Sequence, residues 1–241
     1  MIDPARSFEH VAADYEAARP SYPEEVLDVL PLERDATVLD LGAGTGKLTR
    51  VLVRRYRRVI AVEPLDGMRA ILERVVPEAE SLGGTAEQIP LPDESVDGVF
   101  AATAFHWFAH EAAIAEIARV LRPGGTFAVV WNDVVEPSPL PDAYRERLEE
   151  IFAEMPPPGG SSDEQFEVIG RGRFGELHET TVEHEQVQTR ASTLAFVRST
   201  SPLARRPPDE RDELMAELGA LLPEGEYVFR MKATMRWAER L

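Results

Sequence analysis

The segment Val38–Thr49, which reads VLDLGAGTGKLT, decides how the rest of the chain is interpreted. Just before its glycines, TVLDL at Thr37–Leu41 is too short and too rich in β-branched residues for a helix, so it predicts a strand. The glycines allow a sharp turn and a close approach of backbone to a ligand, because glycine has no Cβ atom. An amphipathic stretch then runs to about Arg58, which completes a first strand, turn and helix.

The spacing of the glycines separates this turn from two better-known nucleotide motifs. A dinucleotide fingerprint that begins at Gly42 requires a sixth-position glycine, where this chain has Lys47. A phosphate-binding loop requires a hydroxyl residue after that lysine, and Leu48 stands there instead. The remaining pattern is an acidic residue followed by three alternating glycines, over Asp40–Gly46.

Short apolar runs continue to alternate with helical stretches beyond this turn. FAVVW at Phe127–Trp131 is continuously apolar, as expected for a strand buried on both faces of a parallel sheet. The further expected strands are Val59–Glu63, Glu80–Gly83, Ser95–Ala104 and Thr126–Trp131, and the expected helices are Asp66–Val75 and Glu111–Leu121. The pattern predicts an α/β core over about Thr37–Asn132.

The two flanking regions have patterns of their own. At the N-terminus, Phe8, Val11, Ala12 and Tyr15 share one helical face, the segment Arg19–Pro23 breaks that helix, and a second helix is expected from near Glu24. On the C-terminal side we expect a helix at Asp142–Glu154, a mobile loop at Met155–Glu164, a strand at Glu176–Gln188, a helix at Pro208–Leu222 and an alternating strand at Tyr227–Trp237. The pattern therefore predicts that strands of the C-terminal half join the same sheet.

Composition narrows the class of protein. The 26 basic and 43 acidic residues give a net charge of −17, which repels a nucleic-acid backbone or an anionic membrane surface. The chain has no cysteine, which excludes disulfides, thiolate zinc sites and cysteine nucleophiles. The N-terminal sequence lacks a secretory pattern, and no apolar run approaches the ~18 residues of a membrane span. We therefore expect a soluble cytoplasmic protein without nucleic-acid or membrane partners.

Two further features lie at the expected carboxyl ends of strands, where open α/β sheets bind ligands. Glu63 follows the first glycine by about 20 residues, the spacing at which an acid reaches ribose hydroxyls in dinucleotide folds, although it could also be a solvated strand-end acid. The string AFHWF at Ala104–Phe108 gathers an imidazole and three aromatic rings. His106 could orient or deprotonate a substrate, or it could be a structural hydrogen-bonding residue among packed rings.

Together with LRPGGTFAVVWN at Leu121–Asn132, these motifs resemble the methyltransferase type 11 family of class I S-adenosylmethionine-dependent methyltransferases. The resemblance covers about Val38–Asn132. AFHWF and the opening pattern Tyr15-x-x-x-Arg19-Pro20-x-Tyr22-Pro23 are most similar to the trans-aconitate methyltransferase-like small-molecule branch.

The resemblance implies a Rossmann-like, doubly wound, seven-stranded and mostly parallel sheet with a reversed last hairpin. It also implies one domain over 1–241, with a helical lid at 1–34, a cofactor-binding core at 35–132 and a C-terminal half at 133–241 that completes the sheet and the acceptor pocket. The implied methyl donor is S-adenosylmethionine, the product is S-adenosylhomocysteine, and no metal is expected.

The resemblance also implies roles for individual residues. Glu63 would bind the ribose, Glu87 would accept the adenine amino group, and Asp40 would help to fix the amino end. The implied cofactor residues are Asp40, Gly42, Ala43, Gly44, Gly46, Glu63, Pro64, Met68, Ala86, Glu87, Thr103, Tyr15 and Arg19. The implied acceptor-pocket residues are Tyr22, Phe105, His106, Trp107 and Trp131, with His106 as the candidate catalytic residue.

The expected reaction is methyl transfer to an oxygen, carboxylate or hydroxyl, of a small molecule by in-line displacement. Three alternatives stay open at this point: a methyltransferase-fold binding or regulatory module without turnover, a protein methyltransferase, and a nicotinamide-dependent oxidoreductase. The acidic surface could accept basic peptides, and the oxidoreductase shares the fold but requires another glycine spacing.

Overall fold

The computed structural model of this chain describes residues 12–135, 137–154, 162–171 and 173–241. The described residues form two compact units. The sheet unit contains Ser21–Asp133, Gly159–Val182 and Lys232–Leu241, and the helical unit contains the described parts of Met1–Pro20, Val134–Pro158 and Glu183–Met231. The division of one domain into lid, core and C-terminal half stays a prediction.

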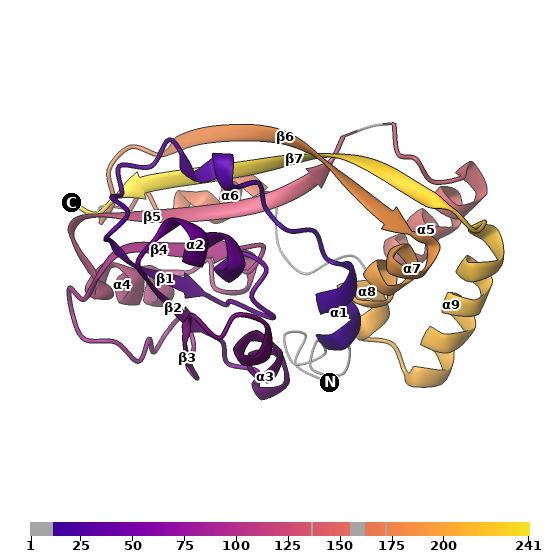
Figure 1. The fold of residues 1–241 in the computed structure, drawn as a ribbon, viewed down its shortest axis with the longest axis horizontal. Coiled ribbons are helices and arrows are strands. Elements are labelled where there is room, and N and C mark those ends of the chain that lie inside the picture. The colour runs from indigo at the N-terminus through magenta and orange to yellow at the C-terminus, as the bar shows by residue number, and fades with distance from the viewer. Residues whose placement is uncertain (1–11, 136, 155–161, 172) are drawn as a thin grey trace. The chain divides into compact units, whose positions relative to one another are not determined.

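Seven strands form one sheet in the order β3-β2-β1-β4-β5-β7-β6 (Figure 1). Their bounds are β1 Thr37–Leu41, β2 Arg58–Val62, β3 Glu80–Leu82, β4 Val96–Ala102, β5 Leu121–Val134, β6 His178–Thr189 and β7 Glu226–Glu239. The first five strands run parallel to their neighbours. Asp40 on β1 is in register with Ala61 on β2 and Phe100 on β4, which aligns the carboxyl ends of these strands.

The last strand, β7, runs antiparallel to both of its neighbours, β5 and β6. The backbone amide of Gly124, near the start of β5, donates to the carbonyl of Arg240 after the end of β7, whereas the amide of Val135, directly after β5, donates to the carbonyl of Arg230, earlier on β7. Residue numbers that rise on one strand and fall on the other define an antiparallel pair. β6 pairs with β7 in the same sense, since Arg236 contacts Glu179 at its start and Arg230 contacts Glu183 further on. The expected mostly parallel sheet with a reversed last hairpin is confirmed.

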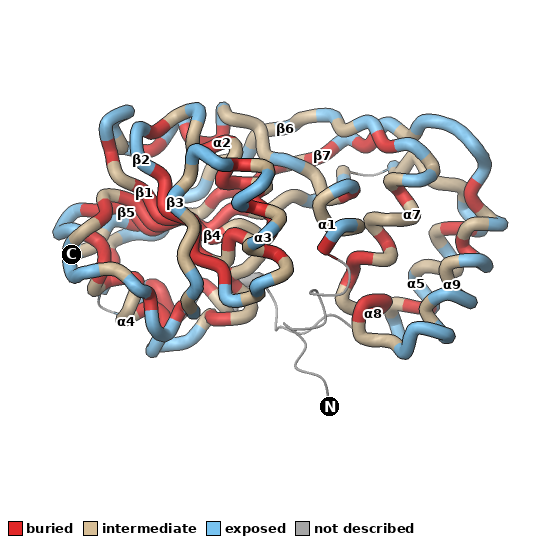
Figure 2. The backbone as a smooth tube through the Cα atoms, turned by 60° about the horizontal axis from the view of Figure 1, so that its bottom comes forward, coloured by how far each residue is buried: buried red, intermediate tan, exposed pale blue. Residues whose placement is uncertain are grey.

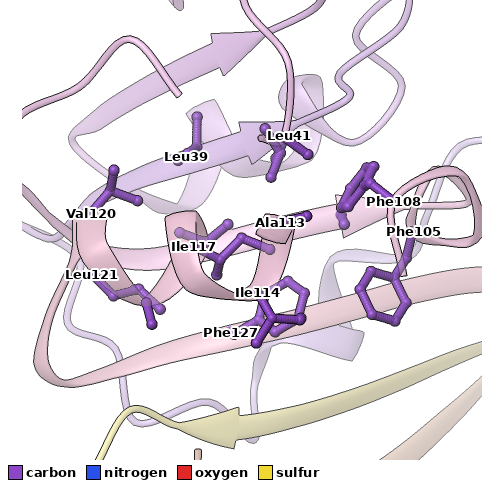
Figure 3. Packing of buried hydrophobic residues seen from close by; sticks show 14 of the residues in the cluster. Leu39, Leu41, Phe105, Phe108, Ala113, Ile114, Ile117, Val120, Leu121 and Phe127 are labelled. Carbon is purple, nitrogen blue, oxygen red and sulfur yellow. The ribbon is translucent and has the colours of Figure 1, made fainter. Parts of the chain in front are cut away.

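Helices cover both faces of the sheet unit. Its helical elements are η2 Glu24–Leu27, α2 Thr49–Arg55, α3 Asp66–Val75, η3 Phe105–Trp107, α4 Glu111–Val120 and α6 Ser162–Glu167. Alternate residues of a strand point to opposite faces. Accordingly, Leu39 packs in one core cluster with Ile117 of α4, and its neighbour Val38 packs in another with Leu52 of α2. Figure 3 shows the first cluster, and Figure 2 shows the burial of β1 and β4. This arrangement is the doubly wound α/β fold.

The helical unit has its own apolar core. Its helices are α1 Ala12–Ala18, α5 Asp142–Glu154, α7 Arg190–Arg198, α8 Ser201–Ala204 and α9 Pro208–Leu221. Tyr144, Ile151, Val197, Leu203, Leu218 and Leu222 are the buried members of one cluster that joins α5, α7, α8 and α9. The N-terminal helix ends at Ala18, directly before the break that Arg19 and Pro20 predict; Phe8 and Val11 lie outside the described residues.

Three expectations about elements need correction. The helix expected from Glu24 is a single 3-10 turn that ends at Leu27. The loop expected up to Glu164 gives way to α6 at Ser162, and residues 155–161 lie outside the described part of the chain. β5 begins at Leu121, because the segment before Thr126 forms an irregularity within the strand instead of a separate turn. Helices α7 and α8 were not predicted.

Candidate functional site

The glycine turn follows β1 at the carboxyl edge of the sheet. Gly42, Gly44 and Gly46 have φ angles of +69°, +58° and +89°, a region that side chains with a Cβ atom rarely adopt. The amides of Gly42 and Ala43 both donate to the carbonyl of Val62 at the end of β2. The turn is therefore fastened to the neighbouring strand by backbone bonds, and the alternating glycines supply its conformation.

The three glycines differ in what surrounds them. A Cβ atom on Gly42 would lie 2.9 Å from the Cβ of Ala104, and one on Gly46 would lie 3.0 Å from Val76 Cγ2. A Cβ atom on Gly44 would meet nothing within 4 Å. Gly42 and Gly46 are thus needed for packing as well as for backbone conformation, whereas Gly44 presents its open side toward space that a ligand can occupy.

Glu63 lies directly after β2 and is bound to the glycine turn. Its carboxylate accepts hydrogen bonds from the amides of Gly44 at 2.8 Å and Leu65 at 2.9 Å. The residue is only 5% exposed, and this burial raises the pKa of Glu63, partly offset by the two backbone donors and by the nearby charge of Arg69. Because a carboxylate has about four acceptor positions, two backbone donors leave capacity for further donors such as ribose hydroxyls.

Asp40 lies beneath the turn, fully buried. Its Oδ2 accepts a hydrogen bond of 2.6 Å from the Thr49 hydroxyl at the start of α2, and Oδ1 has no hydrogen-bond partner among the described residues. Desolvation by burial raises the pKa of Asp40 to about 7, against the opposing effect of Thr49. The structure thus shows Asp40 joining β1 to α2, while contact with an amino end stays a prediction. Sequence reasoning did not single out Thr49.

The start of α3 borders the same edge. Pro64 is exposed and Met68 is 4% exposed, so only the proline presents a free surface there. Arg69 donates to the backbone carbonyl of Glu63 at 3.0 Å and pairs with Asp66, which fixes the first turn of α3 on the end of β2. Arg69 was not predicted as a site residue, and its place three residues after Asp66, in the first turn of α3, was the available signal.

The loop after β3 carries Ala86 and Glu87. Ala86 is buried, whereas the Glu87 side chain is 45% exposed and its Oε1 lies 3.0 Å from His110 Nε2. His110 is the N-cap of α4, where its ring accepts from the backbone amide of Ala113. Sequence reasoning missed His110, although its position directly before the helix at Glu111 is a capping position.

Thr103 follows β4 with a φ of +53°, which is unusual for a β-branched residue. Its hydroxyl lies 2.8 Å from the Tyr22 hydroxyl, and its amide donates to the carbonyl of Val130. Asn132, at the end of β5, donates to the carbonyl of Ser21. Hence the segment around Tyr22 is held across the carboxyl ends of β4 and β5, and the role of Tyr22 in an acceptor pocket stays a prediction.

The aromatic residues after β4 separate into two kinds. Phe105 is 2% exposed and packs against Phe108, Phe127 and Phe166, with ring centroids 5.6–5.7 Å apart. Its assignment to an acceptor pocket is therefore corrected: the ring belongs to the hydrophobic core, because three other rings surround it. Two of those partners come from strand β5 and helix α6, which local sequence does not connect with Phe105.

His106 and Trp107 are half-buried, and their rings lie 4.6 Å apart. Trp131, on β5, is also half-buried; its indole nitrogen donates to Asp133, and its ring lies 5.5 Å from Phe166. These three side chains retain surface at the carboxyl edge of the sheet and can contact a second molecule there.

Tyr15 and Arg19 belong to the helical unit. The Arg19 guanidinium lies 5.0 Å from the Tyr15 ring centre and 4.7 Å from that of Phe196, and it donates to the hydroxyl and carbonyl oxygens of Ser199. The observed role of Arg19 is thus to hold α1 against α7. Cofactor binding by Tyr15 and Arg19 stays a prediction.

The described residues contain no cluster of three or more histidine, aspartate or glutamate side chains arranged to hold a metal ion. No helix among them is both long and apolar enough to cross a membrane.

The sequence profile described as a methyltransferase domain matches residues 39–129. An uncharacterized methyltransferase of Schizosaccharomyces pombe (strain 972 / ATCC 24843) is 33% identical over 222 residues, which are 90% of this chain and 87% of that protein. An uncharacterized methyltransferase of Mycobacterium tuberculosis (strain ATCC 25618 / H37Rv) is 51% identical over 130 residues, so the chain spans about half the length of this relative, 54% of each. Among solved structures, a candidate type II methyltransferase from Anaeromyxobacter dehalogenans superposes with a TM-score of 0.65 at 28% identity, covering 92% of this chain and 97% of that one.

Proposed function

The chain belongs to the methyltransferase domain family of class I S-adenosylmethionine-dependent methyltransferases, and we propose that it transfers a methyl group from S-adenosylmethionine to an oxygen of a small-molecule acceptor. The observation that carries the proposal is the bond between Glu63 and Gly44, with the open side of Gly44 beside it. The glycine turn supplies the backbone shape and Glu63 supplies a hydrogen-bond acceptor, at the edge where such sheets bind ligands.

The residues present fit this cofactor at three places. Gly44 leaves space where a side chain would stand, Glu63 keeps acceptor capacity for ribose hydroxyls, and Glu87 presents an exposed carboxylate for an amino group. The proposed cofactor residues of the sheet unit are Asp40, Gly42, Ala43, Gly44, Gly46, Glu63, Pro64, Met68, Ala86, Glu87 and Thr103. S-Adenosylhomocysteine would leave the same places after transfer.

The work of the protein in this reaction is mainly positioning. The sulfonium of the bound cofactor supplies a methyl group that an acceptor nucleophile takes by in-line displacement, with the thioether as leaving group. The backbone bonds of Gly42 and Ala43 to Val62 hold the turn before any ligand arrives, so little ordering remains to be done on binding. Trp107 and Trp131 would exclude water from the acceptor side.

The acceptor side is proposed from Tyr22, His106, Trp107 and Trp131. A carboxylate acceptor, as in the trans-aconitate methyltransferase-like branch, is already nucleophilic and needs no base. A hydroxyl acceptor would lose its proton, and half-buried His106 could take it in its neutral form. The net charge of −17 favours a small acceptor over a nucleic acid.

The first experiment is a titration of the purified chain with S-adenosylhomocysteine, followed by thermal unfolding. A ligand that binds only the native state stabilises it by about 2.7 kcal/mol at 100 times its dissociation constant. We expect a clear rise in unfolding temperature with S-adenosylmethionine and S-adenosylhomocysteine, and none with nicotinamide dinucleotides. Stabilisation by the dinucleotides alone would replace the proposal with an oxidoreductase.

Turnover is tested separately, by release of S-adenosylhomocysteine over a panel of di- and tricarboxylates, phenols, alcohols and basic peptides. Release with a carboxylate or hydroxyl compound supports the proposal. Release only with peptides would make the chain a protein methyltransferase. Cofactor binding with no release over the panel would favour a binding or regulatory module.

A further inference from the structure

His110 links two segments of the sheet unit that lie far apart in sequence. Its Nε2 lies 3.0 Å from Glu87 Oε1 in the loop after β3, while its Nδ1 accepts a long hydrogen bond of 3.5 Å from Ala113 in the first turn of α4. One imidazole ring therefore connects the N-terminus of a helix to the carboxylate proposed to meet the adenine.

The helix end determines which nitrogen of His110 carries the proton. A backbone amide can only donate, so the Nδ1 that faces Ala113 must present its lone pair. In a neutral ring the proton then lies on Nε2, which points at Glu87 and donates to it. The ring is thus oriented by contacts within the chain, with Nε2 as a donor toward Glu87.

Hydrogen bonds hold the Glu87 carboxylate in place and leave it capacity to accept another. Partial desolvation, the largest single influence, would raise the pKa of Glu87, but hydrogen bonds from Thr85, from its own backbone and from His110 together lower it. The carboxylate is therefore ionised and acts only as an acceptor. Thr85, the backbone of Glu87 and His110 take three of the about four acceptor positions of the carboxylate, so one remains for an incoming donor.

We infer that His110 is a positioning residue that fixes Glu87 as an acceptor for the 6-amino group of a purine, and so makes the site select a 6-amino purine over a 6-oxo purine. The inference rests on the proposed function, because it assumes that Glu87 faces the base of the cofactor. A 6-amino group donates to a fixed carboxylate, whereas a 6-oxo group has no donor there and meets a second acceptor. A mobile Glu87 could turn away from the 6-oxo group, which would weaken the selection.

The test measures the affinity of the full chain for S-adenosylhomocysteine and for its 6-oxo analogue, S-inosylhomocysteine, by calorimetry. His110→Asn retains a good helix N-cap but is too short to bridge to Glu87, whereas His110→Gln caps poorly but retains an N–H of longer reach. The two variants therefore separate the capping role from the contact with Glu87. His178→Asn is the matched control, since that ring packs against Trp237 instead.

For His110→Asn we expect the affinity for S-adenosylhomocysteine to fall about tenfold, with a change of less than about twofold for the 6-oxo analogue. His110→Gln should restore at least part of the selection, and His178→Asn should leave both affinities at the wild-type values. Circular dichroism and unfolding temperature report whether α4 is intact in each variant.

The outcomes distinguish this inference from the proposed function. If the wild type binds S-adenosylhomocysteine but His110→Asn weakens both ligands equally, or neither, His110 does not set the selection and the inference fails alone. If His110→Gln loses selection while His110→Asn keeps it, helix capping is the cause and the inference is overturned. If the wild type binds neither ligand, the proposed function fails and the inference with it.

Discussion

The Glu63 carboxylate accepts a hydrogen bond of 2.8 Å from the backbone amide of Gly44, which joins the end of β2 to the turn after β1. We expect Glu63→Ala to weaken S-adenosylhomocysteine binding at least tenfold, because hydrogen bonds to a charged group contribute about 1.5–3 kcal/mol. Glu63→Gln keeps one acceptor oxygen, so its affinity for S-adenosylhomocysteine should lie between those of the wild type and Glu63→Ala. Isothermal calorimetry measures all three.

The control for this substitution is Glu80→Gln. Glu80, on the adjacent strand β3, is an exposed acid whose carboxylate pairs with Arg58 at 2.8 Å. Its substitution should leave the affinity for S-adenosylhomocysteine unchanged. An affinity within twofold of the wild type for Glu63→Ala would remove Glu63 from the binding site.

Substitutions at two of the positive-φ glycines of the turn should affect different properties of the chain. Gly46→Ala should lower the free energy of unfolding by about 2–4 kcal/mol, from left-handed strain and from the contact with Val76. Gly44→Ala should cost only about 1 kcal/mol, since its Cβ meets nothing within 4 Å, yet reduce cofactor affinity at least tenfold. Urea unfolding and calorimetry measure the two effects.

Gly124→Ala provides the matched control for strain. Gly124 has a φ of +76° and an open side, like Gly44, but it lies at the irregularity in β5. It should show the same small loss of stability with normal affinity. Equal loss of affinity in Gly44→Ala and Gly124→Ala would mean that strain, and not occupied space, explains the effect.

Sequence predicted the elements whose signals are local. The strand Thr37–Leu41 and the helix Asp66–Val75 have the bounds that the sequence predicts, because apolar periodicity and the glycines that end elements both act over a few residues. Helix α7 was missed since β6 ends at Thr189, which is itself the N-cap, so no glycine or proline marks the boundary. A capping pair of Thr189 with Ser192 was the available signal.

The parts of the site that sequence could not reach depend on tertiary contacts. The burial of Phe105 is decided by Phe127 and Phe166, and the partner of Glu87 is His110, on another element. The sequence did predict the alternating glycines and Glu63 as site residues. The positive φ angles of the turn require glycine, and Glu63 is identified by its position directly after a strand.

Asp40 predicts a defined pH dependence of stability. Its pKa rises from 3.8 to about 7 on folding because burial disfavours the charged form. Between these values the folded chain holds a proton that the unfolded chain has lost, so the contribution of Asp40 to stability is full below pH 3.8 and is lost as the pH rises through 7. At about 1.4 kcal/mol per pKa unit, the loss amounts to roughly 4 kcal/mol.

Asp40→Asn removes this titration and keeps an acceptor for Thr49. The free energy of unfolding of Asp40→Asn minus that of the wild type should therefore increase as the pH rises from 3.8 to about 7, because only the wild type loses stability over this range. Urea denaturation at pH 5, 6, 7 and 8 measures the difference. A constant difference across this range would show that Asp40 does not titrate there.

Tyr144 predicts a stabilising substitution in the helical unit. Its side chain is fully buried, its hydroxyl has no hydrogen-bond partner among the described residues, and desolvation raises the pKa of Tyr144 to about 12. Tyr144→Phe removes that unsatisfied hydroxyl and should raise the free energy of unfolding by about 1 kcal/mol. Tyr227→Phe is the matched contrast: it deletes a bond of 2.7 Å to the carbonyl of Pro223 and should lower stability by about 1 kcal/mol. Urea unfolding of both variants decides the matter, since a loss of stability in Tyr144→Phe would mean that the hydroxyl is satisfied in solution.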